Sequence, residues 1–325
     1  MLDRSETDPG DLLSEMLEKL RFQGDPGVHG CYTAPWGLEF AAQPGQAPFY
    51  VVAAGSCWLE MEGEEPRQLY VGDLVLLPRG DAHILRDAPR SRTVAASEVV
   101  PPPDRRIVTV NWGGGGGETH LLGGFFRFDS SFSLPLLGAL ERVILLRAED
   151  PQRANGVDPL LGLFCHEGRS QEPGNRAATS GLLKLLFIQI LRITLSARGP
   201  HGKRCEPNPL VLLFDPVLRR AAEAIHFESH RPWTIAGLAA LAGMSRTTFA
   251  VRFQELTGTS PLAYLTQVRM LNAVDRLERT NDTLEAIARQ VGYGSEAAFS
   301  TAFKRELGVS PGAYRRERSV RKISA

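Results

Sequence analysis

The chain contains the segment Thr234-Ile-Ala-Gly-Leu-Ala-Ala-Leu-Ala-Gly-Met-Ser-Arg-Thr-Thr-Phe249, which returns as Thr283-Leu-Glu-Ala-Ile-Ala-Arg-Gln-Val-Gly-Tyr-Gly-Ser-Glu-Ala-Ala-Phe299. The offset between the copies is 49 residues before a central glycine turn and 50 residues after it, which indicates a one-residue insertion at the turn. Two copies of one unit therefore lie near the C-terminus, and we expect both to fold in the same way.

Each copy has the signals of two short helices joined by a tight turn. Thr234 and Thr283 are suited to cap a helix start, and apolar residues follow at helical spacing. Gly243 and Gly292 stand where that helix has to end in a left-handed residue, which glycine adopts without steric cost. The buried stripe predicted for the second helix is Phe249, Phe253 and Leu256, matched by Phe299, Phe303 and Leu307. This is the pattern of a helix-turn-helix, whose second helix enters the major groove of DNA.

A longer helix is predicted between the units. Ser260-Pro261 and Ser310-Pro311 each begin a helix, with serine as the cap and proline at the first helical position. The residues predicted to lie inside the first of these helices are Leu262, Leu265, Val268, Leu271 and Leu277. From Pro261 to about Arg279 this helix would span about 28 Å, close to the roughly 34 Å between successive major grooves. Both units are then able to bind one face of a duplex.

A helical projection assigns the residues that would contact DNA. The outward faces predicted to meet base edges are Thr247, Thr248, Ala250, Val251 and Gln254 in the first unit, and Glu296, Ala297, Ser300, Thr301 and Lys304 in the second. The candidates for phosphate contact are Arg246, Arg252, Lys304 and Arg305. Because these faces hold few Arg, Asn or Gln side chains, readout through thymine methyl groups or DNA shape is expected.

The charge distribution supports a nucleic-acid partner for this part of the chain. The net charge is zero overall, but residues 211–325 hold 16 Lys and Arg against 11 Asp and Glu, a net of +5, which leaves −5 for the rest. Positive charge in one part alone is typical of attraction to phosphate. A single helix pair with a glycine turn is common in all-α proteins, so a helical-repeat scaffold is the alternative; two matching basic copies favour DNA binding.

Residues from about Asp215 to Arg316 resemble the DNA-binding domain of the AraC/XylS family of bacterial regulators. The resemblance includes the closing pattern Gly-x-Ser-Pro-x-x-Tyr-Arg at Gly308 to Arg315. It implies a seven-helix domain with two helix-turn-helix units, fused to a ligand-sensing or dimerising domain that controls promoter binding. It also implies RNA polymerase as a partner and favours activation over repression. The outward residues named above coincide with positions that this family uses for base contact.

The part of the chain before residue 211 has a different pattern of apolar and turn residues. A helix with Leu12, Leu13, Met16, Leu17 and Leu20 on one face is predicted first, and short β-like runs separated by turns follow to about residue 130. The predicted strands are Gly37–Phe40, Phe49–Val52, Cys57–Met61, Asp73–Leu77, Arg106–Val110 and Gly124–Phe128. Helical periodicity returns over residues 133–197, and a proline-containing linker over 198–210 separates this domain (1–197, with a barrel over about 20–130) from residues 211–325.

Gly72-Asp-Leu-Val-Leu-Leu-Pro-Arg-Gly-Asp-Ala-His83 has the spacing of the second motif of cupin barrels, G-x5-P-x-G-x2-H, with Asp87 in place of the expected Asn. The segment resembles the cupin-like sensor halves of many AraC-type regulators. The predicted fold is therefore mixed α and β in two domains: a cupin-like β-barrel with flanking helices, then an all-α domain with two helix-turn-helix units.

The barrel is predicted to hold a small-molecule effector and neither a metal nor another cofactor. Catalytic cupins take ligands from an earlier histidine-rich motif, and the equivalent stretch near Phe49 has no histidine. His120 is the one plausible helper for His83. The expected cavity lining is Phe40, Tyr50, Trp58, Leu76 and His83. A metal-dependent cupin enzyme with a helical appendage is the alternative, and metal analysis distinguishes the two.

Several smaller features complete the predictions. The apolar stripe from Leu182 to Leu195 is expected to pack on the barrel or to serve a homodimer. Gly113–Gly117 is expected to be a flexible hairpin, because no phosphate-loop Lys-Ser/Thr follows it.

The four cysteines are widely separated, which argues against a zinc site or a disulfide framework, and redox sensing would rest on Cys57. With no secretory signal or membrane-spanning run, the expected location is the cytoplasm and no membrane partner is expected.

Overall fold

The computed structural model describes residues 13, 14, 17, 22–101, 108–128, 137, 138, 140–169, 172–196, 212 and 215–316. The chain divides into two compact units, Leu20–Ala197 and a second made of Arg198–Ala325 together with Met1–Lys19. The division after Ala197 falls where the sequence predicts the linker to begin. Most of residues 1–21, which we assigned to the first domain, lie outside the described residues. The predicted linker, 198–210, lies outside the described residues.

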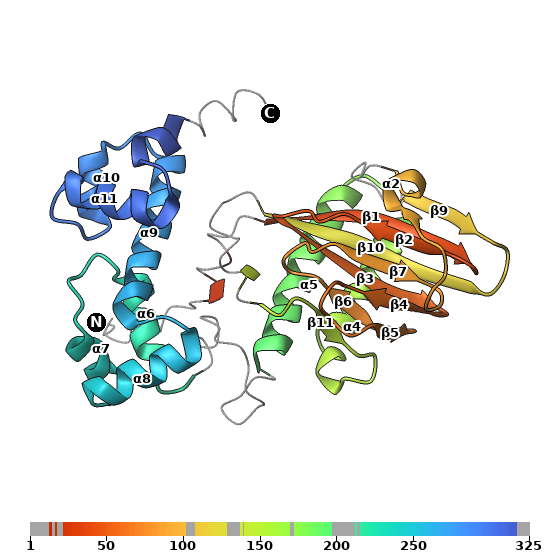
Figure 1. Cartoon of the computed structure of the whole chain (residues 1–325), viewed down its shortest axis with the longest axis horizontal. Helices are drawn as coiled ribbons and strands as arrows, with labels where there is room; N and C mark the ends of the chain where they lie inside the picture. The colour runs from red at the N-terminus through yellow and green to blue at the C-terminus, as the bar shows by residue number, and fades with distance from the viewer. Residues whose placement is uncertain are drawn as a thin grey trace, which may run out of the picture. The chain divides into compact units, whose positions relative to one another are not determined.

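Two sheets make up the body of the N-terminal unit (Figure 1). In the described residues the larger sheet has the order β11-β6-β3-β10-β1-β9, with β1 Phe22–Thr33, β3 Gln46–Ala54, β6 Leu74–Leu76, β9 Val108–Gly113, β10 Glu118–Phe128 and β11 Ile144–Leu146. The smaller sheet has the order β5-β4-β7-β2-β8, with β2 Gly37–Phe40, β4 Ser56–Glu60, β5 Arg67–Tyr70, β7 His83–Arg86 and β8 Val94–Ala95. A short helix, α2 (Ala96–Val99), follows β8.

Apolar side chains from both sheets form one core. Val52, Val75 and Leu121 of the larger sheet share a buried cluster with Leu59 and Leu85 of the smaller sheet. Successive residues of a strand point to opposite faces, so each strand gives only alternate residues to this core. The predicted cupin-like fold of this unit is confirmed, and the structure forms it from two sheets.

The sequence did not predict β1, although it is the longest strand described. Its sequence is rich in glycine and proline, which usually weaken strands, and its pairing with β10 shifts register between Pro26 and His29. The structure explains two of the glycines. A Cβ at Gly24 would overlap Leu183 of a covering helix, and a Cβ at Gly30 would overlap the ring of Tyr32. These glycines allow close packing on a strand.

The glycine run 113–117 does not form the predicted hairpin. β9 pairs in parallel with β1, and β1 lies between β9 and β10 in the sheet. The connection therefore passes over the end of β1, where Gly114 N–H donates to the Thr33 carbonyl (2.8 Å) and Gly116 N–H to the Ala34 carbonyl (2.8 Å). Glycine is needed because a Cβ at Gly116 would lie 2.7 Å from the Ala34 oxygen.

Helices α4 (Val157–Arg169) and α5 (Asn175–Ser196) follow β11, a strand within the region predicted as helical. Leu183, Leu186, Phe187, Ile190 and Leu191 of α5 are at most 2% exposed. The Phe187 ring lies 4.7 Å from that of Phe22 and 4.9 Å from that of Phe126, both in the sheet. The predicted stripe is thus used inside one chain, and its buried residues are not available to a second copy.

Among the described helices, α5 is long and apolar enough, by length and composition, to cross a membrane. Its contacts with β1 show that it serves as a core helix of the N-terminal unit (Figure 1).

The C-terminal unit is helical, as predicted. Its helices are α6 Arg219–Phe227, α7 Ile235–Leu241, α8 Arg246–Thr257, α9 Pro261–Arg279, α10 Leu284–Gln290 and α11 Glu296–Leu307, and residues 311–316 form a further helical segment, as the Ser310-Pro311 pattern predicts. Helix α9 contacts α6, α8, α10 and α11, so it connects the two units of the repeat. Leu262, which we expected inside α9, is 39% exposed, because the inward positions of its first turn belong to Pro261, Tyr264 and Leu265.

Candidate nucleic-acid interface and ligand cavity

The turns of the two helix-turn-helix units have the geometry that the sequence predicts. The Thr234 and Thr283 hydroxyls accept from the Gly237 and Ala286 N–H groups at 3.1 and 3.2 Å. Gly243 and Gly292 have φ values of 63° and 87°, in the left-handed region. The serines that precede α8 and α11, Ser245 and Ser295, cap those helices in the same way.

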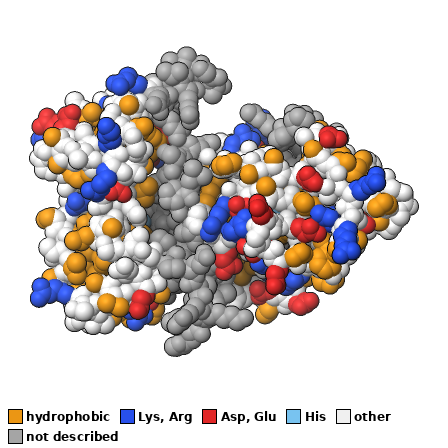
Figure 2. Space-filling model, in the orientation of Figure 1, with side chains coloured by type: hydrophobic (Ala, Val, Ile, Leu, Met, Phe, Trp, Pro, Cys, Tyr) orange, Lys and Arg blue, Asp and Glu red, His pale blue; other side chains and the backbone are white. Residues whose placement is uncertain are grey.

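Helices α8 and α11 each bury one face and expose the other. Phe249, Phe253, Phe299 and Phe303 are fully buried, as expected. The predicted DNA-contacting residues of both helices are all exposed or half-exposed, and Val251 is 52% exposed. On the face in view, Figure 2 shows Lys and Arg side chains spread over the C-terminal unit with fewer acidic ones among them. The geometry offers two separate outward surfaces of small and polar side chains.

Some hydroxyls on these surfaces already have protein partners. The Thr248 hydroxyl lies 2.8 Å from the Ser245 hydroxyl at the start of α8. The Thr301 hydroxyl donates to the Ala297 carbonyl one turn earlier (2.9 Å). Both hydroxyl groups retain acceptor capacity, and both threonines present a methyl group suited to contact with thymine.

Arg252 is held by a carboxylate. Its Nη2 lies 2.7 Å from Oδ2 of Asp215, whose other oxygen accepts from the Val217 and Leu218 N–H groups at the start of α6. Burial raises the pKa of Asp215, but the hydrogen bonds from Arg252 and from these backbone groups outweigh burial and leave that pKa below its ordinary value. Arg252 thus ties α8 to α6, and its charge is already compensated, which weakens its assignment as a phosphate contact.

Arg269 of α9 joins the two repeats. Its Nε donates to the Ser229 carbonyl (2.7 Å) and its Nη2 to the Arg231 carbonyl (2.8 Å), both in the loop before α7. Its guanidinium also lies over the ring of Tyr293 in the turn of the second unit, 5.6 Å from the centroid. This side chain therefore helps to set the angle between the two helix-turn-helix units, a role that the sequence did not reveal.

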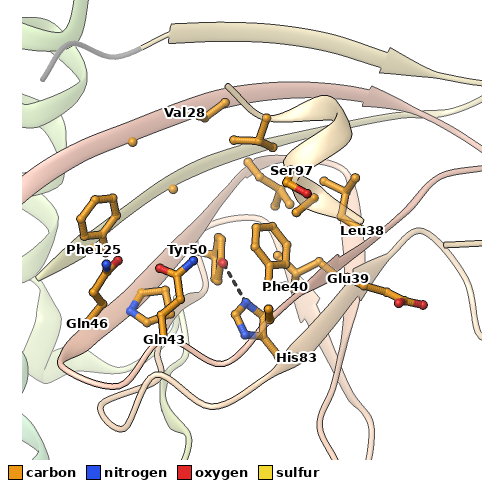
Figure 3. Close-up of a pocket in the computed structure, with 18 of the residues that line it drawn as sticks. Val28, Leu38, Glu39, Phe40, Gln43, Gln46, Tyr50, His83, Ser97 and Phe125 are labelled. Atoms are coloured by element: carbon orange, nitrogen blue, oxygen red, sulfur yellow. Dashed lines mark hydrogen bonds between the residues drawn. The ribbon is translucent and has the colours of Figure 1, made fainter. Parts of the chain in front are cut away.

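A cavity of about 520 Å³ opens into the β-barrel. Most of its lining is apolar, from β1, β2, β3, β7, β10 and α2, and Figure 3 shows Phe40, Tyr50 and His83 close together among the lining residues. The polar side chains that also line it are Glu39, Gln43, Gln46, Asp81 and Ser97. A volume of this size is typical of small-molecule sites.

His83 and Tyr50 form a buried hydrogen-bonded pair. The Tyr50 hydroxyl lies 2.7 Å from Nε2 of His83, and Nδ1 of His83 lies 2.9 Å from the Asp81 carbonyl. Because a carbonyl only accepts, Nδ1 carries the proton and Nε2 accepts from Tyr50. Burial lowers the pKa of His83 to about 4, against the opposing effect of the Asp81 carbonyl, so the ring is neutral at pH 7. The Phe40 ring stacks on His83 at 4.7 Å.

Phe40, Tyr50 and His83 line the cavity as predicted, whereas Trp58 and Leu76 do not. The strand period explains both corrections. Cys57 and Leu59 point into the core, so Trp58 between them points to the other face of β4. Leu76 pairs with Phe49, whose ring packs on Phe126 and Phe164 on the face of the sheet away from the barrel interior.

Residues 11–196 match the cupin family and residues 238–317 match a helix-turn-helix domain. A protein of Streptomyces lividans named as an AraC-like transcription regulator is 36% identical over 94% of this chain and 98% of its own length. The HTH-type transcriptional regulator AlkR of Acinetobacter baylyi is 29% identical over 94% of this chain and 99% of its own length. A solved structure, the DNA-binding domain of AdpA in complex with a target DNA, is 37% identical, with 34% of this chain and 99% of that chain covered and a TM-score of 0.32.

The chain belongs to the AraC family of transcription regulators. It is a DNA-binding regulator with a cupin domain. Within this AraC-type regulator, the alternation of strand residues could have excluded Trp58 from the cavity. The contributions of Gln43 and Gln46 were not predictable, because both stand in or beside a turn whose path only the folded barrel sets.

Redox sensing by Cys57 does not fit this AraC-type regulator. The Cys57 side chain is fully buried, and burial, with a smaller effect of Asp73, raises its pKa to about 12. The thiol therefore stays protonated at neutral pH, whereas oxidation requires a thiolate that is accessible to the oxidant.

Proposed function

We propose that this regulator binds promoter DNA through the exposed faces of α8 and α11, and that a small molecule in the barrel cavity controls the binding. The observation that carries the proposal is the pair of outward surfaces in matching positions of a repeated unit. The 19-residue helix α9 between the units spans about 28 Å, which suits two adjacent major grooves. Base contacts from residues such as Thr247 and Thr301 supply the specificity.

The cavity favours an effector that is mainly apolar and carries a few hydrogen-bonding groups. Apolar walls dominate its lining, and the His83–Tyr50 pair places a polar group among them. In place of the bond between the two residues, an effector hydroxyl would donate to Nε2 of His83, or an effector carbonyl would accept from the Tyr50 hydroxyl. Control of DNA binding then requires that the effector bind the DNA-competent and the incompetent arrangements with different affinity.

Activation of transcription, contact with RNA polymerase, a cytoplasmic location and a homodimer are further parts of the proposal. Because α5 uses its stripe on the sheet, the dimer has to use another surface. In the described residues, α4 and α5 each leave one large apolar side chain exposed, Leu163 at 53% and Leu185 at 49%. Light scattering of the Leu163→Asp and Leu185→Asp variants tests each of these side chains as a dimer contact, and an unchanged mass in both would reject them.

The test of the regulator is genome-wide mapping of bound sites with and without candidate metabolites. We expect sites that share a sequence motif and an occupancy that changes with the effector. In solution the full chain should shift such a site in a salt-sensitive manner. Tyr50→Phe should weaken the effector response, whereas Trp58→Phe, outside the cavity, is the matched control. Occupancy spread evenly over the genome would contradict sequence-specific regulation.

The enzyme alternative receives no support from the cavity. The one histidine in its described lining uses both ring nitrogens in contacts with protein atoms. Two relatives that match 94% of this chain are named as transcription regulators. An enzyme of the cupin type would lose a bound metal on His83→Ala substitution, so this variant, rather than total metal content, is the decisive measurement.

A further inference from the structure

Three side chains with metal-binding atoms meet on the larger sheet of the N-terminal unit. They are His29 and Cys31 of β1 and His120 of β10. Their candidate ligand atoms all lie within 4.8 Å of one another, and the rings of His29 and His120 have centroids 5.7 Å apart. All three residues are half-buried, and the His120 side chain is 32% exposed, so an ion from solvent can reach them.

Strand register brings the three together. β1 and β10 pair antiparallel with Cys31 directly opposite His120, and His29 stands two residues before Cys31 on the same strand. Residues two apart on a strand share a face, and directly opposed residues share a face as well. The cluster is therefore a consequence of the pairing itself.

The cluster lies on the face of the sheet opposite the barrel cavity. Tyr32 and Leu121, the neighbours of Cys31 and His120, point into the core and line the cavity. Alternation places Cys31 and His120 on the other side of their strands. The sheet thus separates these residues from His83, and His120 is not the helper for His83 that the sequence suggested.

The positions of the three residues are well fixed. β1 is paired on one side with β10 and on the other with β9, and β10 is also paired with β3. Residues on inner strands are held by backbone hydrogen bonds along both edges. Ligands on such rigid elements keep their geometry better than ligands on loops, and less ordering entropy is lost when an ion binds.

We propose that His29, Cys31 and His120 bind one zinc ion. A thiolate with two imidazoles is a donor set that Zn²⁺ prefers, and in a tetrahedral site the ligand atoms stand about 3.4–3.8 Å apart. Side-chain rotation from separations of at most 4.8 Å reaches that geometry. The fourth position falls to water or to Glu118, whose Oε2 lies 3.3 Å from Nε2 of His120 and whose side chain is 72% exposed.

The spacing rules used on the sequence did not reveal this site. They look for CxxC pairs or for histidines three to five residues apart. Here His29-x-Cys31 is a two-residue spacing that suits a strand, and His120 is distant in sequence. The expectation that the cysteines argue against a zinc site rested on local spacing alone, and the proposal reverses it.

The proposal does not depend on the role assigned to the cavity, and its test uses the purified full chain under reducing conditions. Zn²⁺ is titrated into metal-stripped protein in competition with a chromogenic chelator. We expect one tight equivalent, with affinity reduced about 100-fold or more by Cys31→Ser and by His120→Gln. Cys165→Ser, which removes an exposed thiol of α4, and Cys205→Ser should keep the tight equivalent.

Cobalt provides a direct readout of the ligand set. Co²⁺ added in place of zinc should produce thiolate-to-metal charge-transfer absorption that is lost in Cys31→Ser and kept in Cys165→Ser. Circular dichroism of each variant confirms that the fold is intact. Absence of a tight equivalent in the unsubstituted chain, or a tight equivalent and cobalt band that survive Cys31→Ser, would overturn the proposal. Loss of the metal on His83→Ala alone would place it in the barrel instead.

Discussion

At the scale of single residues, the two turn glycines occupy equivalent positions but different surroundings. Both have left-handed backbones. A Cβ at Gly243 would meet nothing within 4 Å, whereas a Cβ at Gly292 would lie 2.7 Å from the His230 carbonyl oxygen and 2.9 Å from Nη2 of Arg269. In the first helix-turn-helix unit, glycine is therefore needed only for the left-handed backbone. In the second unit it is needed also because a side chain would collide with His230 and Arg269.

We expect Gly243→Ala to lower the free energy of unfolding by about 1 kcal/mol, the cost of a left-handed alanine. Gly292→Ala should cost about 3 kcal/mol, because the backbone of His230 has to move as well. Calorimetric melting of the full chain measures both variants. Equal losses in the two would show that the contact with His230 contributes nothing.

His83 makes the stability of the N-terminal unit depend on pH. Its pKa is about 4 in the folded chain because of burial, and about 6.5 in an unfolded chain. Above pH 6.5 the ring is neutral in both the folded and the unfolded chain, so the contribution of the neutral ring to the free energy of unfolding is fully present. Between pH 6.5 and 4 only the unfolded chain takes up the proton, and the free energy of unfolding falls by up to about 1.4 kcal/mol for each pH unit.

Urea unfolding followed by tryptophan fluorescence checks this pH dependence. A Trp233→Phe background leaves Trp36, Trp58 and Trp112, all in the N-terminal unit, as reporters. The free energies of unfolding of Trp233→Phe and of the Trp233→Phe, His83→Gln double variant are compared. Their difference should shrink as the pH falls from 6.5 to 4. A difference that is constant over this range would mean that His83 titrates normally in the folded chain.

At the scale of secondary-structure elements, the contact between α5 and β1 depends on Gly24. A Cβ there would overlap Leu183, so Gly24→Ala should overpack the contact and cost about 1–3 kcal/mol. Gly181→Ala in α5 is the matched control, because a Cβ there meets nothing within 4 Å and alanine favours the helix by about 0.5–1 kcal/mol. The melting temperature should therefore fall in Gly24→Ala and rise in Gly181→Ala. A stabilising Gly24→Ala would contradict the close packing described.

Helix α8 offers a comparison between two arginines of different setting. Arg246 is exposed at the start of α8, whereas Arg252 is paired with Asp215 at 2.7 Å. We expect Arg246→Gln to reduce by about one the slope of log affinity for DNA against log salt, as loss of one phosphate contact does. Arg252→Gln should leave that slope nearly unchanged and lower stability instead. The reverse pattern in salt-dependent binding assays would restore Arg252 as a phosphate contact.

At the scale of the whole molecule, the C-terminal unit is expected to read one duplex at two places. Thr247→Ala in α8 and Thr301→Ala in α11 should each change the preferred base, at positions about 10 base pairs apart, because successive major grooves on one face of DNA recur at that interval. Selection and sequencing of DNA bound by the full-length variants measures both positions. If both substitutions altered the same base pair, the two-groove arrangement would be wrong.

The amino-acid sequence alone determined the repeat, its caps, its left-handed glycines and the buried phenylalanine stripes. These features are local, because a cap acts on an N–H three residues away and a helical stripe repeats within four residues. The same holds for the cupin motif that ends in His83 and for most of the strands with alternating apolar residues. The family and the general function followed from these local patterns.

Tertiary structure alone decided which face of β6 lines the cavity at Leu76, where the glycine-rich strand β1 pairs, and that Arg252 meets Asp215. Each of these depends on which distant segments pair, and pairing energies are summed over whole strands and helices. The meeting of His29 and Cys31 with His120 is the plainest case. Two strands far apart in sequence had to become neighbours in register before the three side chains shared a face.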